Sequence, residues 1–133
     1  MSKLSATVVS ITSYEMLSIV TFDVCGHTLQ MMSLNMQKRL HEGDKVVLGI
    51  KPWSVALVHK KVEQSSFTNQ ILAKVVRIEE GELLTRVVLE VGEERLESVI
   101  LRQNVADLAL HEGDDVVAVI PVGDISVAEV TDV

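Results

Sequence analysis

Apolar and polar residues alternate along two stretches of the chain that lie 67 positions apart. In the first stretch, the residues at every second position are Met16, Ser18, Val20, Phe22 and Val24. In the second stretch they are Leu83, Thr85, Val87, Leu89 and Val91. An alternation with a period of two is typical of a β-strand with one buried face. The pattern therefore predicts a half-buried strand in each half of the chain.

The likeness between the two halves extends to further segments. LSATVVSI (4–11) matches ILAKVVRI (71–78), and LHEGDKVVLGI (40–50) matches LHEGDDVVAVI (110–120) at eight of eleven positions. The offset is 67 residues for the first pair and 70 for the second, so the second half carries three additional residues. Internal repetition over this length indicates two copies of one supersecondary unit.

Each copy contains five short segments rich in Val, Ile and Thr, which a pleated sheet favours. We expect strands near 4–12, 16–24, 27–33, 45–51 and 54–59, and again near 71–79, 83–91, 95–100, 115–121 and 125–130. A short helix or turn is expected near 34–40 and 102–109, followed by positive φ angles at Gly43 and Gly113. This order predicts an all-β protein of two tandem five-stranded OB-like barrels, each with a short helix or turn before its fourth strand.

The polar segment HKKVEQSSFT (59–68) separates the two copies. We therefore expect a first module at 1–60, a linker at 61–67 and a second module at 68–133. A module of about 60 residues buries little surface by itself. We expect the two copies to cover each other's apolar faces.

Charge and composition exclude several classes of function. The chain has 133 residues and a net charge of −7, with 12 Lys and Arg against 19 Asp and Glu. Nucleic-acid binding requires clustered positive charge and, for single strands, aromatic platforms, but the aromatic residues are only Tyr14, Phe22, Trp53 and Phe67. A membrane span and a secretory signal are not expected either. The single cysteine, Cys25, fits a reducing compartment, so a cytoplasmic protein without nucleic-acid partners is expected.

Catalytic and metal-binding motifs are not expected. The chain contains no phosphate loop, no nucleophile elbow and no carboxylate pair suited to acid–base catalysis. His41 and His111 each precede a glutamate, but adjacent His-Glu pairs lack the spacing of zinc ligands. We therefore expect neither an enzyme nor direct cation ligands.

Three segments of the first copy form a pattern that resembles a known family. Residues 4–11 read L-x-A-x-V-V-x-I, residues 40–46 read L-x-E-G-D-x-V, and residues 50–55 read I-K-P-W-S-V. This combination resembles the TOBE module of molybdate-handling proteins. Two such modules in one chain are similar to the di-domain molbindins and to the C-terminal molybdate-binding half of the molybdate-responsive transcription regulator.

The resemblance implies a non-catalytic homo-oligomer that binds molybdate or tungstate between modules, for storage, buffering or sensing. The family's ligands lie in a T-S-A-R-N-Q run before the first strand, at a Thr or Ser after the third strand, and in a K-A-S stretch after the fourth. In this chain the first run is SSFTNQ (65–70), and the last stretch lies within IKPWSV (50–55). The implied oxyanion ligands are Ser33, Lys51, Ser54, Ser66, Thr68 and Asn69.

The chain departs from the family pattern in ways that leave an alternative open. Thr68 stands where the family often has Arg, and the second copy's equivalent of IKPWSV, within IPVGDIS (120–126), has no lysine and carries Asp124, which would repel an anion. Neither copy holds a complete ligand set, so a site would combine Lys51 and Ser33 of the first copy with Ser66 and Asn69 of the second. The alternative function is a non-catalytic assembly or partner-recognition module that has lost oxyanion binding. The stretch IKPWSV also has an alternative interpretation of its own, with Lys51 at a strand end and Trp53 in the core.

Overall fold

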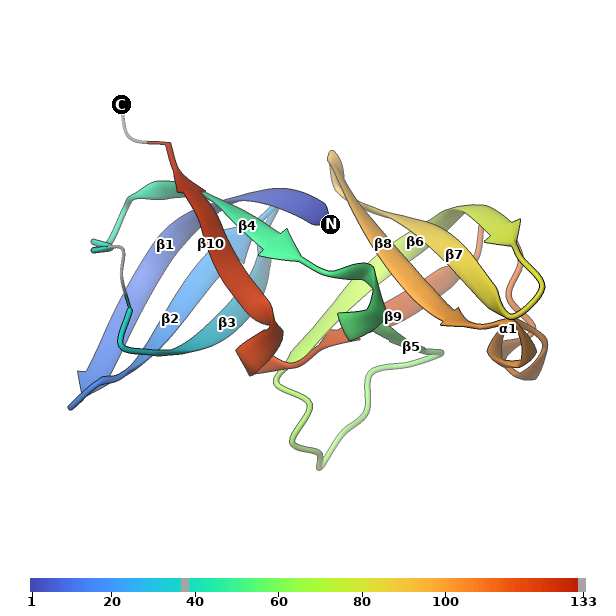
Figure 1. Ribbon diagram of the computed structural model, residues 1–133, viewed down its shortest axis with the longest axis horizontal. Helices are drawn as coiled ribbons and strands as arrows, with labels where there is room; N and C mark the ends of the chain where they lie inside the picture. The colour runs from blue at the N-terminus through green and yellow to red at the C-terminus, as the bar shows by residue number, and fades with distance from the viewer. Residues whose placement is uncertain (37–38, 132–133) are drawn as a thin grey trace.

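The computed structural model describes residues 1–36 and 39–131 and consists of two curved, antiparallel five-stranded sheets that lie side by side (Figure 1). The first sheet has the order β10-β4-β1-β2-β3, formed by β10 (Ile125–Val130), β4 (Lys45–Ile50), β1 (Ser2–Tyr14), β2 (Leu17–Val24) and β3 (His27–Leu34). The second has the order β5-β9-β6-β7-β8, formed by β5 (Ala56–Val58), β9 (Asp115–Ile120), β6 (Asn69–Glu80), β7 (Leu84–Val91) and β8 (Glu94–Leu101). Short helices complete the fold: η1 (Pro52–Ser54), α1 (Arg102–Leu108) and η2 (Val122–Asp124). The all-β fold class with two five-stranded sheets is confirmed.

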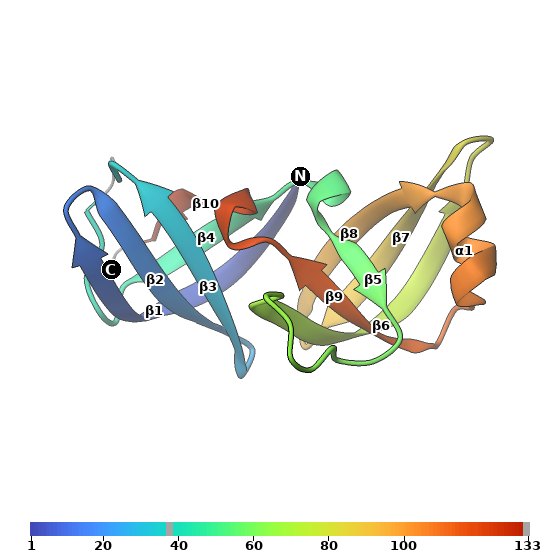
Figure 2. The ribbon, with the colours of Figure 1, turned by 90° about the horizontal axis from the view of Figure 1, so that it is seen from below.

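The two halves exchange their fifth strands. β5 follows η1 in the first half but pairs with β9 in the second sheet, where Ala56 lies opposite Val119. β10 follows η2 in the second half but pairs with β4 in the first sheet, where Ile125 lies opposite Ile50 (Figure 2). The strands expected near 54–59 and 125–130 therefore exist, but the expectation that each would complete its own half was wrong. Each five-stranded sheet therefore contains one strand from the other half.

The repeated LHEGD phrase forms the same turn in both halves. In the first half, the His41 amide donates to Asp44 Oδ2 (2.8 Å) and the Gly43 amide donates to the Val8 carbonyl (2.8 Å). Val8 lies where the β1–β2 register shifts, and its own amide donates to the Asp44 carbonyl (2.9 Å). The second half repeats these contacts through His111, Asp114, Gly113 and Val75. The phrase is repeated because the same turn docks on the same irregular strand, with the predicted positive φ at Gly43 (+89°) and Gly113 (+94°).

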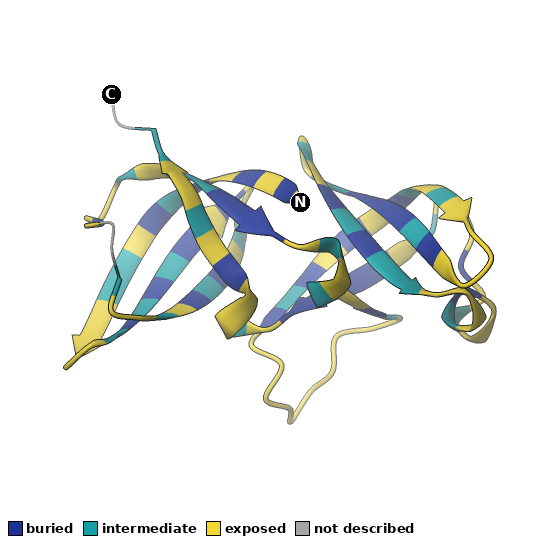
Figure 3. Ribbon diagram, viewed as in Figure 1, coloured by how far each residue is buried: buried dark blue, intermediate teal, exposed yellow. Residues whose placement is uncertain are grey.

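The predicted alternation of buried and exposed positions is visible along the strands (Figure 3). Val20, Phe22, Val87 and Leu89 have no exposed surface and form part of the core. The helix expected near 102–109 is α1, which ends where Ala109 adopts a left-handed conformation. In the first half the corresponding stretch includes residues 37–38, which lie outside the described part of the chain; residues 35–36 and 39–40 on either side are not helical.

One polar side chain in the second sheet is buried without a partner. Thr85 has no exposed surface, and its hydroxyl has no hydrogen-bond partner among the described residues. The equivalent residue of the first half, Ser18, shares a hydrogen bond of 2.9 Å with the hydroxyl of Ser13. The second half holds Glu80 at the position of Ser13, and Glu80 is instead near Arg102.

We expect Thr85→Val to raise the free energy of unfolding by about 1 kcal/mol, because it removes an unpaired hydroxyl at nearly constant volume. Urea denaturation of the two proteins measures this change, with the same dependence of the free energy of unfolding on urea concentration used for both. Ser18→Ala is the control and is expected to lower stability, because its partner Ser13 would lose a hydrogen bond. A Thr85→Val protein less stable than the parent would contradict the expectation.

Candidate functional site

A pocket of about 750 Å³ lies where the chain leaves the first sheet through η1 and enters the second sheet as β5. Its polar lining consists of Ser54 in η1, Ser66 and Thr68 at the end of the linker, and Asp124 in η2. The rest of the lining is apolar and comes mainly from Trp53, Phe67 and the valine and isoleucine side chains of β8 and β9. Ser98 of β8 fixes this arrangement, because its buried hydroxyl donates to the Val55 carbonyl directly after η1 (2.6 Å).

The structure places three of the predicted ligands in the lining of one pocket, whereas Lys51 is not among the residues that line it. Ser54, Ser66 and Thr68 line the same pocket although the first is more than ten residues from the others in sequence. Lys51 is exposed, and its Nζ lies 5.9 Å from the centroid of the Trp53 ring, a cation–π geometry. Trp53 is 72% exposed, so it does not fill the core as the alternative interpretation of this stretch supposed.

The side chain of Asn69 has a structural role in the fold. It is 1% exposed, and its Oδ1 accepts a hydrogen bond from the Gln30 amide (2.8 Å). Its Nδ2 donates to the Gln30 carbonyl (2.9 Å) and to the Ile120 carbonyl (3.0 Å). The side-chain amide of Asn69 thus pairs with the backbone of the edge strand β3 much as another strand would. Both hydrogens of Nδ2 are used, which leaves this side chain no donor for a ligand.

Gln70 and Ser65, the remaining hydrogen-bonding side chains at the start of the second half, order the linker. Gln70 Oε1 accepts from the Val62 amide (2.6 Å), and its Nε2 donates to the carbonyls of Val62 (2.9 Å) and Phe67 (2.9 Å). Ser65 donates to the Val62 carbonyl (3.2 Å) and accepts from the Phe67 amide (3.2 Å). These bonds hold residues 62–67 as a closed loop and so position Ser66 and Thr68 at the pocket.

Ser33 lies apart from the other predicted ligands. It lines a smaller pocket of about 340 Å³ between β3 and β10, together with Met31, Met32, Met36 and Ser126. This pocket occupies, in the first sheet, the position that the larger pocket occupies in the second.

The described lining of the larger pocket carries negative charge only. Among the described residues that line it, Asp124 is the only charged one, and it is exposed. Three hydroxyl groups can donate to an anion, while the carboxylate of Asp124 opposes one. In the part of the chain that the structure describes, no group of three or more His, Cys, Asp or Glu side chains could hold a metal ion. No helix among the described residues is long and apolar enough to cross a membrane.

Comparison with known proteins finds a family model that matches the segment containing part of this site. Residues 65–126 match the TOBE domain family. The matched segment begins directly before Ser66 and Thr68 and includes Asp124. No curated protein sequence matches the chain significantly.

The whole chain is also similar in structure to the cytoplasmic molybdate-binding protein ModG, in a crystal form with molybdate bound. The TM-score is 0.86 with 23% sequence identity, and the alignment covers 93% of this chain and 92% of that one. At this identity the likeness establishes a shared fold. It extends over both halves, whereas the TOBE match covers only the second.

The half without a TOBE match is related to the other by an approximate twofold axis. The Glu97 amide donates to the Ser2 hydroxyl (2.9 Å), and the Gln30 amide donates to Asn69 Oδ1. Ser2 and Asn69 are 67 residues apart, and so are Gln30 and Glu97. The first residue of β1 thus caps the edge strand β8 of the second sheet, and the first residue of β6 caps the edge strand β3 of the first sheet. Sequence reasoning missed these contacts, although the 67-residue offset that relates them was visible in the repeat.

Proposed function

We propose that this protein is a non-catalytic binding protein for molybdate or tungstate, which binds in the pocket lined by Ser54, Ser66 and Thr68. The observation that carries the proposal is that these three residues, from two separate segments, line one pocket together with Trp53, whose ring lies 5.9 Å from Lys51 Nζ. The TOBE match over residues 65–126 and the fold shared with ModG, described as a molybdate-binding protein, support it.

The mechanism is passive replacement of the ion's hydration shell. The hydroxyls of Ser54, Ser66 and Thr68 donate hydrogen bonds to the oxyanion, and the ammonium of Lys51 turns from the Trp53 ring to supply positive charge. Discrimination against the smaller sulfate ion rests on the spacing of these donors, because a pocket of about 750 Å³ is much larger than either ion. Ser33 and Asn69 are left out of this ligand set, because Ser33 lines another pocket and Asn69 uses its amide within the fold.

A thermal-denaturation series with molybdate, tungstate and sulfate tests this proposal. If the affinity is micromolar, millimolar molybdate or tungstate raises the free energy of unfolding by about 4 kcal/mol, and sulfate raises it much less. Lys51→Ala is expected to abolish the difference between the ions, while the substitution Lys61→Ala, at an exposed lysine of the linker, leaves it unchanged. Trp53 is the single tryptophan and lines the pocket, so its fluorescence reports the same binding. Equal shifts with all three ions would contradict the proposal.

Asp124 is expected to limit the affinity. Removing a like charge at an exposed rim is worth about 1 kcal/mol at low ionic strength, so Asp124→Asn tightens molybdate binding roughly fivefold. This variant serves as a test of position, because an oxyanion bound elsewhere on the molecule would not respond to Asp124.

A second function is favoured by the apolar part of the pocket. Trp53 is 72% exposed and Phe67 is 47% exposed, and both line it. Such a surface suits an assembly or partner-recognition module that has lost oxyanion binding. No ion-specific thermal shift, together with self-association in sedimentation velocity, would favour this function. Under both functions we expect a cytoplasmic homo-oligomer without nucleic-acid partners.

A further inference from the structure

A group of arginine side chains lies on the outer face of the second sheet. Arg77 of β6, Arg86 of β7 and Arg95 of β8 line a groove of about 490 Å³ together with Glu97 and two valines. None of these residues lines the pocket of the proposed oxyanion site. The chain has five arginines in all, so three of them gather in this groove although the net charge of the protein is −7.

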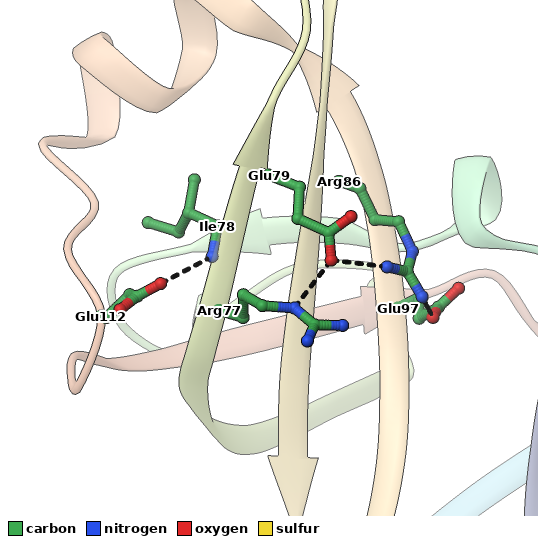
Figure 4. A network of polar contacts seen from close by, with 6 residues as sticks. All are labelled: Arg77, Ile78, Glu79, Arg86, Glu97 and Glu112. Atoms are coloured by element: carbon green, nitrogen blue, oxygen red, sulfur yellow. Dashed lines mark hydrogen bonds and ion pairs between the residues drawn. The ribbon is translucent and has the colours of Figure 1, made fainter.

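Ion pairs fix the central arginine. Arg86 Nη1 pairs with Glu79 Oε2 (2.7 Å), and Arg86 Nη2 pairs with Glu97 Oε2 (Figure 4). The hydrogen bond to Glu97, more than that to Glu79, raises the pKa of Arg86 above its usual value. Its guanidinium therefore stays charged and is held in one orientation across three adjacent strands.

The two outer arginines keep unused donors. Arg77 pairs with Glu79 through Nε (2.7 Å), and Arg95 pairs with Glu90 through one Nη (3.4 Å). A guanidinium carries five N–H groups on three nitrogens. Among the described residues, no partner is present for either Nη of Arg77, or for Nε and the second Nη of Arg95. In Figure 4 the guanidinium of Arg77 extends from β6 across β7, toward Arg86 and Glu97.

The folding of such a sheet does not require these arginines. The first sheet has the same strand order, and the positions equivalent to Arg77, Arg86 and Arg95 are Ser10, Ile19 and Thr28. The arginines are therefore a property of the second half alone. The three arginines pair with three carboxylates, those of Glu79, Glu90 and Glu97, so the groove offers open N–H donors rather than an excess of positive charge.

We propose that this groove binds a tetrahedral oxyanion such as phosphate, either free or as a phosphoryl group on a larger molecule. Arg77 and Arg95 supply the open donors, and Arg86 holds the positive charge between them. Paired N–H groups of a guanidinium match two oxygens of such an anion. The site is independent of the proposed molybdate pocket, since the two share no residue.

The test is a titration of the full chain with inorganic phosphate, at an ionic strength held constant with chloride, followed by the NMR signals of the arginine side chains. We expect saturable shifts at Arg77 and Arg95, and at least a tenfold loss of affinity in the double variant Arg77→Gln/Arg95→Gln. Arg102→Gln is a matched control, because the exposed fraction of Arg102 is 58%, against 59% for Arg77 and 58% for Arg95. Lys51→Ala is expected to bind phosphate normally, which separates this site from the molybdate pocket.

Two outcomes would overturn the inference. The first is an absence of saturable shifts at Arg77 and Arg95, and the second is an equal loss of affinity in Arg102→Gln and the double variant. A short phosphoserine peptide titrated alongside decides the source of the anion. Tighter binding of the peptide than of inorganic phosphate assigns the groove to a phosphoryl group on a larger molecule, and equal or weaker binding assigns it to the free ion.

Discussion

Replacing Asn69 by alanine is expected to lower the free energy of unfolding by about 3 kcal/mol, because three hydrogen bonds are lost together. The amide and carbonyl of Gln30 and the carbonyl of Ile120 would lose the partner that joins the two halves. Asn69 is 1% exposed, so water cannot replace its side chain without entering the junction. Urea denaturation followed by circular dichroism measures the change.

The control for this substitution is Asn104→Ala. Asn104 lies in α1 and is half-buried, and alanine is the better helix former, so little loss of stability is expected. The family pattern makes Asn69 an oxyanion ligand instead. That role predicts an Asn69→Ala protein with nearly unchanged stability and no response to molybdate. A loss of stability below about 1 kcal/mol would favour the ligand role over the one derived from the hydrogen bonds.

The strand positions could be predicted from the sequence because each follows from its own local pattern. The alternation through Val20 and Phe22 identifies a strand without knowledge of its neighbours. The turn at Gly43 likewise depends only on residues close to it in the chain. These parts of the fold therefore agree with the expectation, with β1 and β6 extending a few residues further.

The exchange of fifth strands could not be predicted, because the repeat makes the two pairings almost equivalent. β4 and β9 have closely similar sequences, so β5 finds similar partners in either one. Which sheet each fifth strand joins depends on the direction of the chain after η1 and η2 and on contacts such as that of Ser98 with Val55. These are properties of the assembled molecule.

Only part of the arrangement at the candidate site could be predicted from the sequence. Ser66 and Thr68 alternate along the chain and both reach the pocket, whereas Asn69, the next residue, begins β6 and is buried. A polar residue at the first position of a strand can face a ligand or the neighbouring half. The sequence holds no signal that separates these two cases, because the edge strand that Asn69 caps lies 39 residues away.

The junction of the two halves also depends on a close contact between two turns. Cys25 is in the turn between β2 and β3, and Gly92 is in the turn between β7 and β8, 67 residues later. They are equivalent residues of the repeat and meet near the approximate twofold axis. A Cβ atom on Gly92 would lie 2.8 Å from Cys25 Cβ and 3.0 Å from Cys25 Sγ. The Cβ of Cys25 is fixed to the backbone, so it cannot move without moving its turn.

Gly92→Ala is therefore expected to lower the free energy of unfolding by about 3 kcal/mol, from overlap with Cys25 and from a φ of +59° that alanine adopts poorly. Gly26→Ala separates these two causes, because its φ is +85° and no atom lies within 4 Å of the added Cβ. Gly26→Ala should lower the free energy of unfolding by about 1 kcal/mol, from backbone strain alone. The double variant Cys25→Gly/Gly92→Ala should recover the stability that Gly92→Ala loses beyond the loss in Gly26→Ala, since it removes the overlapping atoms. Equal losses in the two single glycine variants would mean that the turns yield to the added methyl group, and that the junction rests on Asn69 and Ser2 rather than on this contact.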